Sequence, residues 1–306
     1  MPALGSSFAL VTQYIRNLRG GSQPILARAS DGLVYVVKFN NNLQGVNLPF
    51  NESAGSELYR ACGLAVPSWQ PLQVTDAFLD QNPDCWMHTQ EGRLRPESGL
   101  CFGSRFLGGD GARLFEILPG TSFKLVSNRE NFWLAWLIDI CAGHTDNRQA
   151  IFREDAAGRL SAVFIDHGHM FGGAEGGQRP HFQASRYLDP RVYQAVSSQH
   201  RSGIYRTAES LDTDQLWRRV QELPDAWKTP SALESFAQCL GKLSTRRVLR
   251  GVLNTIVDSL VWNGECEDCR QKYGREPAVS ILHPRVQGAE RDRAHVAICA
   301  DRCARA

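Results

Sequence analysis

The sequence lacks a long hydrophobic run, and this absence limits its relation to membranes. No stretch of the 306 residues approaches the roughly 18 consecutive apolar residues that a membrane span needs. Residues 1–21 also lack the charged segment followed by an apolar segment that marks a secretion signal. With 42% hydrophobic and 22% charged residues, the composition is typical of a globular fold. We therefore expect a cytoplasmic protein that makes no contact with a membrane.

The sequence also lacks an excess of charge and a regular cysteine pattern. Its 34 Lys and Arg residues against 32 Asp and Glu give a net charge of +2, too small for binding nucleic acid by neutralising many phosphates. A local basic groove stays open as an alternative, but we expect no direct nucleic-acid binding. The nine cysteines predict no disulfide framework. Five of them lie among apolar neighbours, as reduced core thiols do: Cys62, Cys85, Cys101, Cys141 and Cys239.

The first hundred residues predict a small sheet with one helix. Strand-like and turn-like segments alternate over residues 14–39. A polar loop over 40–49 precedes a predicted helix over 52–62, which is followed by a glycine that can end it. Short apolar runs within 68–107 predict further strands. The glycine-rich segment 108–111 predicts a boundary between two parts of the fold.

The rest of the chain predicts a mainly helical part that contains one hairpin. Residues 131–142 are apolar on nearly every side, which predicts a buried helix. A polar loop over 143–149 leads to predicted strands over 150–152 and 160–165. Helical periodicity resumes over 211–260.

A lysine ends the valine-rich strand near the N-terminus. Lys38 follows two valines, so its ammonium needs a polar partner, and Glu52 at the start of the next predicted helix is suitable. One strand earlier, Gly20 and Gly21 would let backbone N–H groups approach phosphate oxygens. Each feature alone has an ordinary explanation, an edge-strand lysine or a hairpin turn. Their occurrence together favours a phosphate-binding site.

Two aspartates directly follow buried elements. Asp146 comes soon after the predicted helix over 131–142, and Asp166 comes directly after the predicted strand over 160–165. A carboxylate that is held by a rigid element but open to solvent suits a general base or a Mg²⁺ ligand. Capping of turns is the alternative for each aspartate alone. Beside Lys38, capping at both positions is the less economical explanation.

The order of these motifs resembles the HipA-like kinases. The series comprises GGSQP, YVVKF, a Glu-led helix ending in CGLAVP, then FGSRFL, GHTDNRQAIF and VFIDHG, and it extends over residues 14–230. The resemblance implies an α+β, two-lobed protein-kinase-like fold with ATP in the cleft between the lobes. It implies a β-rich N-lobe over 1–107 and a mainly helical C-lobe over 108–262. A cysteine-containing tail, expected to be mobile, remains over 263–306.

The resemblance also implies roles for single residues. Asp146 would orient or deprotonate the acceptor hydroxyl, Asp166 would bind Mg²⁺, and Glu52 would pair with Lys38. A hinge over 102–106 would lie beside the adenine. The implied nucleotide-binding residues are Gly20, Gly21, Ser22, Lys38, Phe102, Gly103 and Phe106. The implied acceptor is a Ser or Thr hydroxyl of a protein, including the kinase itself, and an antitoxin-like protein is the implied regulatory partner.

The chain departs from the kinase pattern at one position. Kinases of this fold place an asparagine about five residues after the catalytic aspartate as a second metal ligand, and here Ile151 stands at that position. Gln149 is the nearest substitute, and Asn147 is a second candidate. A nucleotide-binding regulator with impaired catalysis is therefore an alternative to an active kinase.

The histidines near both aspartates raise a second alternative, a metal-dependent hydrolase. His144, His167, His169 and His181 could ligate a transition metal together with the aspartates. That hypothesis gives no role to Lys38 or to the glycine-rich turn. Within the kinase interpretation, His144 and His167 are instead expected to brace the catalytic loop through hydrogen bonds.

The tail carries two pairs of cysteines. Their spacings, C-x₂-C and C-x₃-C, suit Zn²⁺, although the segment between the pairs is longer than in compact zinc modules. Structural zinc and a mobile tail therefore both stay open for Cys266, Cys269, Cys299 and Cys303.

Overall fold

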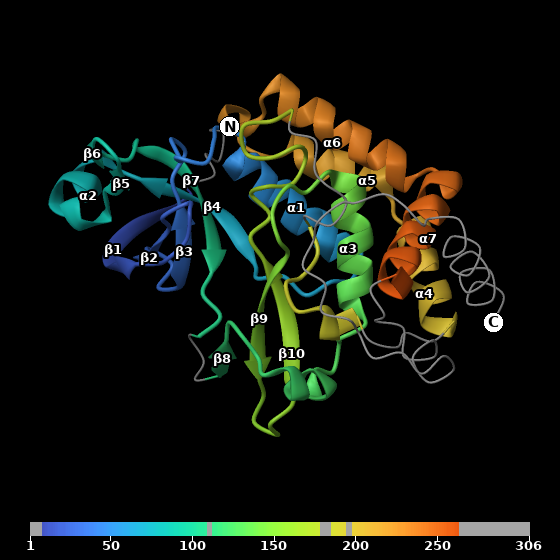
Figure 1. The fold of residues 1–306 in the computed structure, drawn as a ribbon. Coiled ribbons are helices and arrows are strands. Elements are labelled where there is room, and N and C mark those ends of the chain that lie inside the picture. The colour runs from blue at the N-terminus through green and yellow to red at the C-terminus, as the bar shows by residue number, and fades with distance from the viewer. Residues whose placement is uncertain (1–7, 109–111, 178–184, 194–197, 263–306) are drawn as a thin grey trace, which may run out of the picture.

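The computed structural model describes residues 8–108, 112–177, 185–193 and 198–262. Within these residues a small β-barrel stands beside a group of helices, and helix α1 (Leu48–Ala61) lies between them (Figure 1). This combination is the α+β arrangement expected from the sequence. No helix among the described residues is both long and apolar enough to cross a membrane.

Five strands close into the barrel in the order β1, β2, β3, β7, β4. Their bounds are Ala9–Asn17, Ile25–Ala29, Val34–Lys38, Gly99–Arg105 and Trp69–Val74, respectively. Neighbours pair antiparallel except β1 and β4, which pair in parallel where Ala9 faces Leu72. Alternate side chains fill the barrel; Ile25 and Val37, opposite each other on β2 and β3, are fully buried. The predicted strands and turns of the N-terminal segment are thus confirmed.

Helix α1 begins four residues earlier than predicted. The expectation of a loop through residue 49 is wrong for its last two residues, because Pro49 occupies the first turn of the helix, where its missing N–H is not needed. The predicted end is confirmed, since Gly63 follows with a φ of +74°. Every residue from Leu48 to Tyr59 is buried.

Strands form within 68–107 as predicted, and between β4 and β7 the chain also forms a short helix that was not predicted. The short helix α2 (Asp76–Gln81) starts at Thr75, whose hydroxyl accepts a hydrogen bond from the Phe78 N–H at 3.2 Å. A two-stranded hairpin follows, formed by β5 (Met87–Thr89) and β6 (Gly92–Leu94). A short 3₁₀ turn, Pro83–Cys85, lies between α2 and β5, and others in the described chain cover Gly120–Leu125, Pro190–Tyr193 and Asp225–Trp227.

Helix α3 (Asn131–Ala142) forms over the predicted residues and is the centre of the second core. Gly143 ends it with a φ of +65°. The predicted hairpin is also present, as β9 (Gln149–Glu154) and β10 (Leu160–Ile165), and β8 (Arg113–Phe115) pairs with the free side of β9. Phe132 of α3 packs against Phe164 of β10 with ring centroids 5.0 Å apart. The hairpin is therefore fixed to the buried helix.

The remaining helices complete the second core. Their bounds are α4 Ser198–Glu209, α5 Thr213–Gln221, α6 Pro230–Leu243 and α7 Arg246–Trp262. The helical stretch predicted over 211–260 is confirmed, whereas α4 was not predicted. Trp227 is buried at the junction before α6, and its indole N–H donates to the Leu100 carbonyl at 3.1 Å. This hydrogen bond ties the helices to strand β7.

Candidate active site

Lys38 and Glu52 form a buried ion pair. Lys38 ends strand β3, which lies between β2 and β7 and is therefore not an edge strand. Glu52 lies in the second turn of α1, and its Oε1 contacts the Lys38 Nζ. Lys38 is 7% exposed and Glu52 is 2% exposed. Because an isolated charge at such depth is strongly unfavourable, each residue needs the other, and the expected pairing is present.

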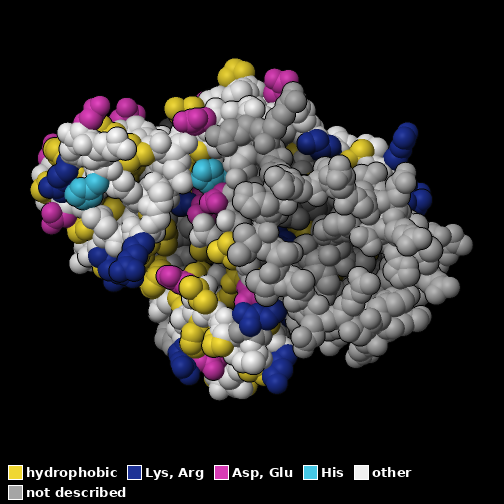
Figure 2. Space-filling model, viewed as in Figure 1, with side chains coloured by type: hydrophobic (Ala, Val, Ile, Leu, Met, Phe, Trp, Pro, Cys, Tyr) yellow, Lys and Arg dark blue, Asp and Glu magenta, His cyan; other side chains and the backbone are white. Residues whose placement is uncertain are grey.

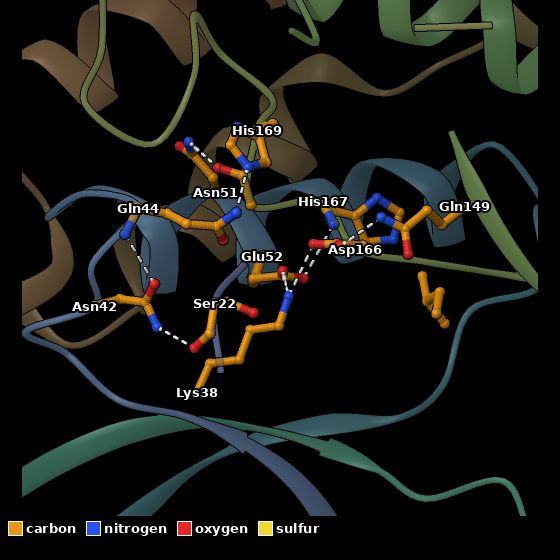
Figure 3. A network of polar contacts seen from close by, with 12 residues as sticks. Ser22, Lys38, Asn42, Gln44, Asn51, Glu52, Gln149, Asp166, His167 and His169 are labelled. Carbon is orange, nitrogen blue, oxygen red and sulfur yellow. Dashed lines mark hydrogen bonds and ion pairs between the residues drawn. The ribbon is translucent and has the colours of Figure 1, made fainter. Parts of the chain in front are cut away.

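Asp166 joins this pair from a distant part of the sequence. It directly follows β10, and its Oδ1 lies 2.9 Å from the Lys38 Nζ, although the two residues are 128 positions apart. Figure 3 shows the Lys38 ammonium directed at both carboxylates. The Asp166 side chain is 24% exposed. The arrangement is therefore open to solvent on the Asp166 side.

The charges of the three groups depend on one another. Burial alone would raise the pKa of Asp166, but attraction to the Lys38 ammonium outweighs it and holds the pKa well below its usual range. Burial likewise would lower the pKa of Lys38, but Asp166 and Glu52 raise it above its ordinary value. Lys38 is therefore an ammonium and Asp166 a carboxylate at neutral pH.

The backbone at Asp166 takes a conformation that is rare outside glycine. Its φ is +62°, in the left-handed region that costs an L-residue roughly 1–2 kcal/mol. The next N–H, of His167, donates to the Glu52 Oε2 at 3.1 Å. Glu52 thus uses one oxygen for the Lys38 side chain and the other for the backbone that follows Asp166. The left-handed turn directs the Asp166 carboxylate towards Lys38.

Gln149 holds the second oxygen of Asp166. It begins β9, opposite Ile165 in the hairpin register, and its Nε2 donates to Asp166 Oδ2 at 2.9 Å. The sequence-based role of Gln149 as a substitute metal ligand stays a prediction. The amide presents its nitrogen to Asp166, so a half-turn of the amide would be needed to direct its oxygen at a metal. Ile151 lies within β9.

Asp146 lies in the loop between α3 and β9. Its carboxylate accepts a hydrogen bond from the N–H of Asn147 at 2.7 Å and does not belong to the network of Lys38, Glu52 and Asp166. The loop itself is tied to the segment after Asp166, because the Thr145 N–H donates to the His169 carbonyl at 3.0 Å. The assignment of Asp146 as the base stays a prediction.

The two glycines of the glycine-rich turn have different surroundings. Gly20 has a φ of +134°, which favours glycine, and no other described atom lies within 4 Å of the position of a Cβ there. A Cβ at Gly21 would lie 2.7 Å from the Gln44 side-chain nitrogen. The Ser22 carbonyl accepts from Asn42 Nδ2 at 2.8 Å (Figure 3). The turn is thus packed onto the loop before α1.

Two amide side chains that were not predicted from the sequence hold the segment that follows Asp166. Gln44 Nε2 lies 2.9 Å from His169 Nε2. Asn51, in the first turns of α1, directs its Nδ2 at the carbonyls of Gly168, Met170 and Gly173 at 2.9, 2.8 and 3.2 Å. Because Asn51 directly precedes the helix predicted over 52–62, it is typical of an N-cap there, and nothing in the pattern indicates these contacts.

The residues assigned to the adenine occupy the barrel wall. Phe102 is buried and stacks on Trp69 with centroids 5.8 Å apart. A Cβ at Gly103 would lie 2.3 Å from Leu72 Cδ1, so the barrel itself requires this glycine. Residues 102–105 belong to β7, and the Phe106 N–H continues the pairing by donating to the Val34 carbonyl at 2.9 Å. Contact of Phe102, Gly103 and Phe106 with a nucleotide stays a prediction.

Of the two histidines expected to brace the catalytic loop, His167 contacts a residue of that loop and His144 does not. His144 is buried, yet neither of its ring nitrogens has a hydrogen-bond partner, so the expected brace from this side chain is wrong. Burial, assisted by the nearby Arg148 charge, lowers the pKa of His144 to about 4. His167 does contact Arg148, through Nδ1 at 3.3 Å from Nη1. Burial, assisted by the nearby Arg148 charge, lowers the pKa of both rings and keeps them neutral.

A transition-metal cluster finds no support within the described ranges. No group of three His, Cys, Asp or Glu residues there is arranged to hold a metal ion. His181 and the cysteines at 266, 269, 299 and 303 lie outside the described residues.

On the face shown in Figure 2, acidic side chains and a histidine gather where the barrel adjoins the rest of the molecule.

Comparison with known proteins shows similarity at the level of the fold. No protein-family model and no curated protein matches the sequence. The structure of the proinflammatory kinase CtkA of Helicobacter pylori is similar with a TM-score of 0.51 at 10% identity, over 82% of this chain and 98% of that chain. The expected kinase-like fold is thereby confirmed, while the resemblance to HipA-like kinases stays a prediction.

Two structures of the Golgi casein kinase are also similar, at lower TM-scores. One, with Mn/ADP bound, has a TM-score of 0.44 at 12% identity, over 92% of this chain and 78% of that chain. The other has a TM-score of 0.47 at 13% identity, over 85% and 75%, respectively.

Proposed function

We propose that this chain is an ATP- and Mg²⁺-dependent phosphotransferase of two lobes, the barrel with residues 1–107 and the helical part with 108–262. The observation that carries the proposal is the network in which Lys38 contacts both Glu52 and Asp166. A lysine that only stabilised the fold would be satisfied by one buried carboxylate. Here a second, partly exposed carboxylate shares the same ammonium, which is the charge arrangement that a metal-bound phosphate chain requires.

The residues at the network fit a nucleotide and a metal. Mg²⁺ prefers one or two carboxylates, with waters and phosphate oxygens as its other ligands. Asp166 supplies an ionised, partly exposed carboxylate, and Gln149 beside it would supply an amide oxygen after rotation. Lys38 would hold the α- and β-phosphates, and the open space at Gly20 leaves room for phosphate oxygens to approach the turn. When bound, the metal would neutralise charge that develops on the phosphates.

The acceptor is proposed to be a Ser or Thr hydroxyl of a protein. Asp146 would orient this hydroxyl or remove its proton, from a loop that the Thr145–His169 hydrogen bond fixes beside the segment after Asp166. A phosphorylated site on the chain itself would be found by mass spectrometry after incubation with ATP and Mg²⁺. The antitoxin-like partner implied by the sequence resemblance stays a prediction.

The proposal is tested by calorimetric titration with a non-hydrolysable ATP analogue, with and without Mg²⁺. We expect Mg²⁺-dependent binding that is lost in Lys38→Met and in Asp166→Ala. Lys124→Met removes an exposed lysine of the 3₁₀ turn 120–125 and serves as the matched control, with binding unchanged. Absence of binding by the folded wild-type chain would refute the proposal.

A regulator with impaired catalysis is a second candidate, favoured by the environment of Asp166. Its Oδ2 receives an amide N–H from Gln149, and Ile151 stands where a kinase has a metal-binding asparagine. Asp146→Ala separates the candidates. A kinase variant would retain nucleotide binding but lose phosphate transfer, whereas a regulator would show no transfer in the wild type and unchanged nucleotide-dependent behaviour in the variant.

A further inference from the structure

A buried arginine lies directly behind Asp166. Arg148 is 1% exposed, although it stands in a polar loop of the sequence. Its Nε and Nη2 donate to the two oxygens of Asp139 on α3 at 2.8 and 2.9 Å. Such a two-point pair fixes the plane and direction of the guanidinium. Tyr59 of α1 covers it, with the guanidinium carbon 5.0 Å from the ring centroid and the Tyr59 hydroxyl 2.7 Å from Asp139 Oδ1.

The remaining nitrogen of Arg148 reaches the backbone at the site. Its Nη1 donates to the Ile165 carbonyl at 2.8 Å and to the Asp166 carbonyl at 3.2 Å. These carbonyls flank the residue whose φ is +62°. A left-handed non-glycine residue persists only where its surroundings over-determine it. The Arg148 guanidinium constrains the backbone of Asp166 in this way, because Asp139 and Tyr59 hold the guanidinium itself in place.

We propose that Arg148 is a positioning residue that holds Asp166 in the left-handed turn, so that the Asp166 carboxylate faces Lys38 and the metal site. The inference deepens the proposed function and rests on it for the metal. Arg148 acts through Asp166 and has no role in contacting the nucleotide. The spacing from Asp146 places the residue on the catalytic loop, so one loop carries both the proposed base and the support of the proposed metal ligand.

The first readout does not depend on nucleotide binding. In the wild type, contact with Asp166 and Glu52 shields the Lys38 nitrogen, and the residue is 7% exposed. If Asp166 moves away, Lys38 loses one of its two carboxylate partners and its nitrogen becomes more accessible to an acylating reagent. Acylation of Lys38, followed by mass spectrometry of the full chain, should therefore be faster in Arg148→Lys. Asp166→Ala gives the upper limit of this effect.

The second readout is binding of Mn²⁺ together with ADP, followed by electron paramagnetic resonance. Loss of a residue that orients a metal ligand typically weakens metal binding 10–100-fold. We expect a loss in this range for Arg148→Lys, with binding of metal-free ADP unchanged. Tyr59→Phe removes only the hydroxyl contact to Asp139 and should show a smaller loss of Mn²⁺ binding. This variant still tests the proposal if Arg148→Lys fails to fold.

Glu57→Gln is the matched control. Glu57 is also buried on α1 and pairs with Arg219 at 2.9 Å, but it makes no contact with Asp166. It should lose stability while Lys38 acylation and Mn²⁺ binding stay at wild-type values. Unchanged acylation in Arg148→Lys and Tyr59→Phe would overturn the positioning role, as would an equal increase in Glu57→Gln. If the wild type binds no Mn²⁺ with ADP, the proposed function fails, and the acylation rates still decide the role of Arg148.

Discussion

The contact between α1 and the segment after Asp166 is so close that one methyl group should disrupt it. A Cβ at Gly55 would lie 2.6 Å from the Cβ of His167 and 2.7 Å from the Sδ of Met170. Neither neighbour can move freely, because the His167 N–H is bonded to Glu52 and the Met170 carbonyl to Asn51. Gly55→Ala should therefore overpack the interface, which typically costs about 1–3 kcal/mol.

A second helical glycine isolates this effect. Gly241 lies on the exposed side of α6, and outside the helix's own backbone no atom of the described residues is within 4 Å of its Cβ position. Alanine at either site gains about 1 kcal/mol of helix propensity. Because both variants share that gain, the difference between them measures the overpacking alone. We expect Gly241→Ala to raise the free energy of unfolding by about 1 kcal/mol relative to the wild type. The free energy of unfolding of Gly55→Ala should be about 1–3 kcal/mol lower than that of Gly241→Ala.

Urea unfolding followed by circular dichroism measures both changes. The urea midpoint should be higher for Gly241→Ala than for the wild type, and it should be lower for Gly55→Ala than for Gly241→Ala. Both variants should show the same dependence on denaturant concentration. Equal stabilisation by the two alanines would show that α1 and the segment after Asp166 are not packed as described, and the reasoning on the site would fail with it.

Two further outcomes concern buried titratable groups. The pKa of His144 is about 4 in the fold against about 6.5 when unfolded, so its stabilising contribution is complete above pH 6.5 and is lost as the pH falls to 4, by about 3 kcal/mol in all. Thermal unfolding against pH should show this loss, reduced in His144→Asn; an unaltered pH profile in that variant would contradict the assignment. Burial raises the pKa of Cys62, Cys101 and Cys141 to about 12. Iodoacetamide at pH 8 should leave all three unlabelled until the chain is denatured, as peptide mass spectrometry would show.

The strong local patterns of the sequence predicted the corresponding elements. Helix α3 was predicted to the residue because its apolar run ends at a glycine that accepts a left-handed conformation. The hairpin was predicted because the turn residues at 154–159 separate two apolar runs. Helices α2 and α4 were missed, since α2 has only six residues and α4 is mostly polar, so neither has a marked apolar periodicity.

The site was predicted only in part, because its contacts are formed between distant segments. Lys38, Glu52 and Asp166 were chosen from motif order, and the fold brings these three together. Arg148 was missed, since it stands in a loop whose other residues are polar. A signal existed in Asp139, which is an acidic residue inside an otherwise apolar helix and therefore demands a buried partner. Nothing in the spacing indicates that this partner also reaches the backbone at Asp166.

Helix α1 carries Glu52, so an outward movement of α1 would separate Glu52 from Lys38. Displacing α1 would break three hydrogen bonds from Asn51 and the one between Glu52 and the His167 N–H. A buried polar group left without a partner costs about 1–3 kcal/mol, so an outward movement of α1 alone is strongly opposed. Helix α1 and residues 167–173 therefore move together or not at all. Because Arg148 ties the backbone of Ile165 and Asp166, directly before that segment, to α3, the network at Lys38 is preformed in the folded chain rather than assembled by a helix movement.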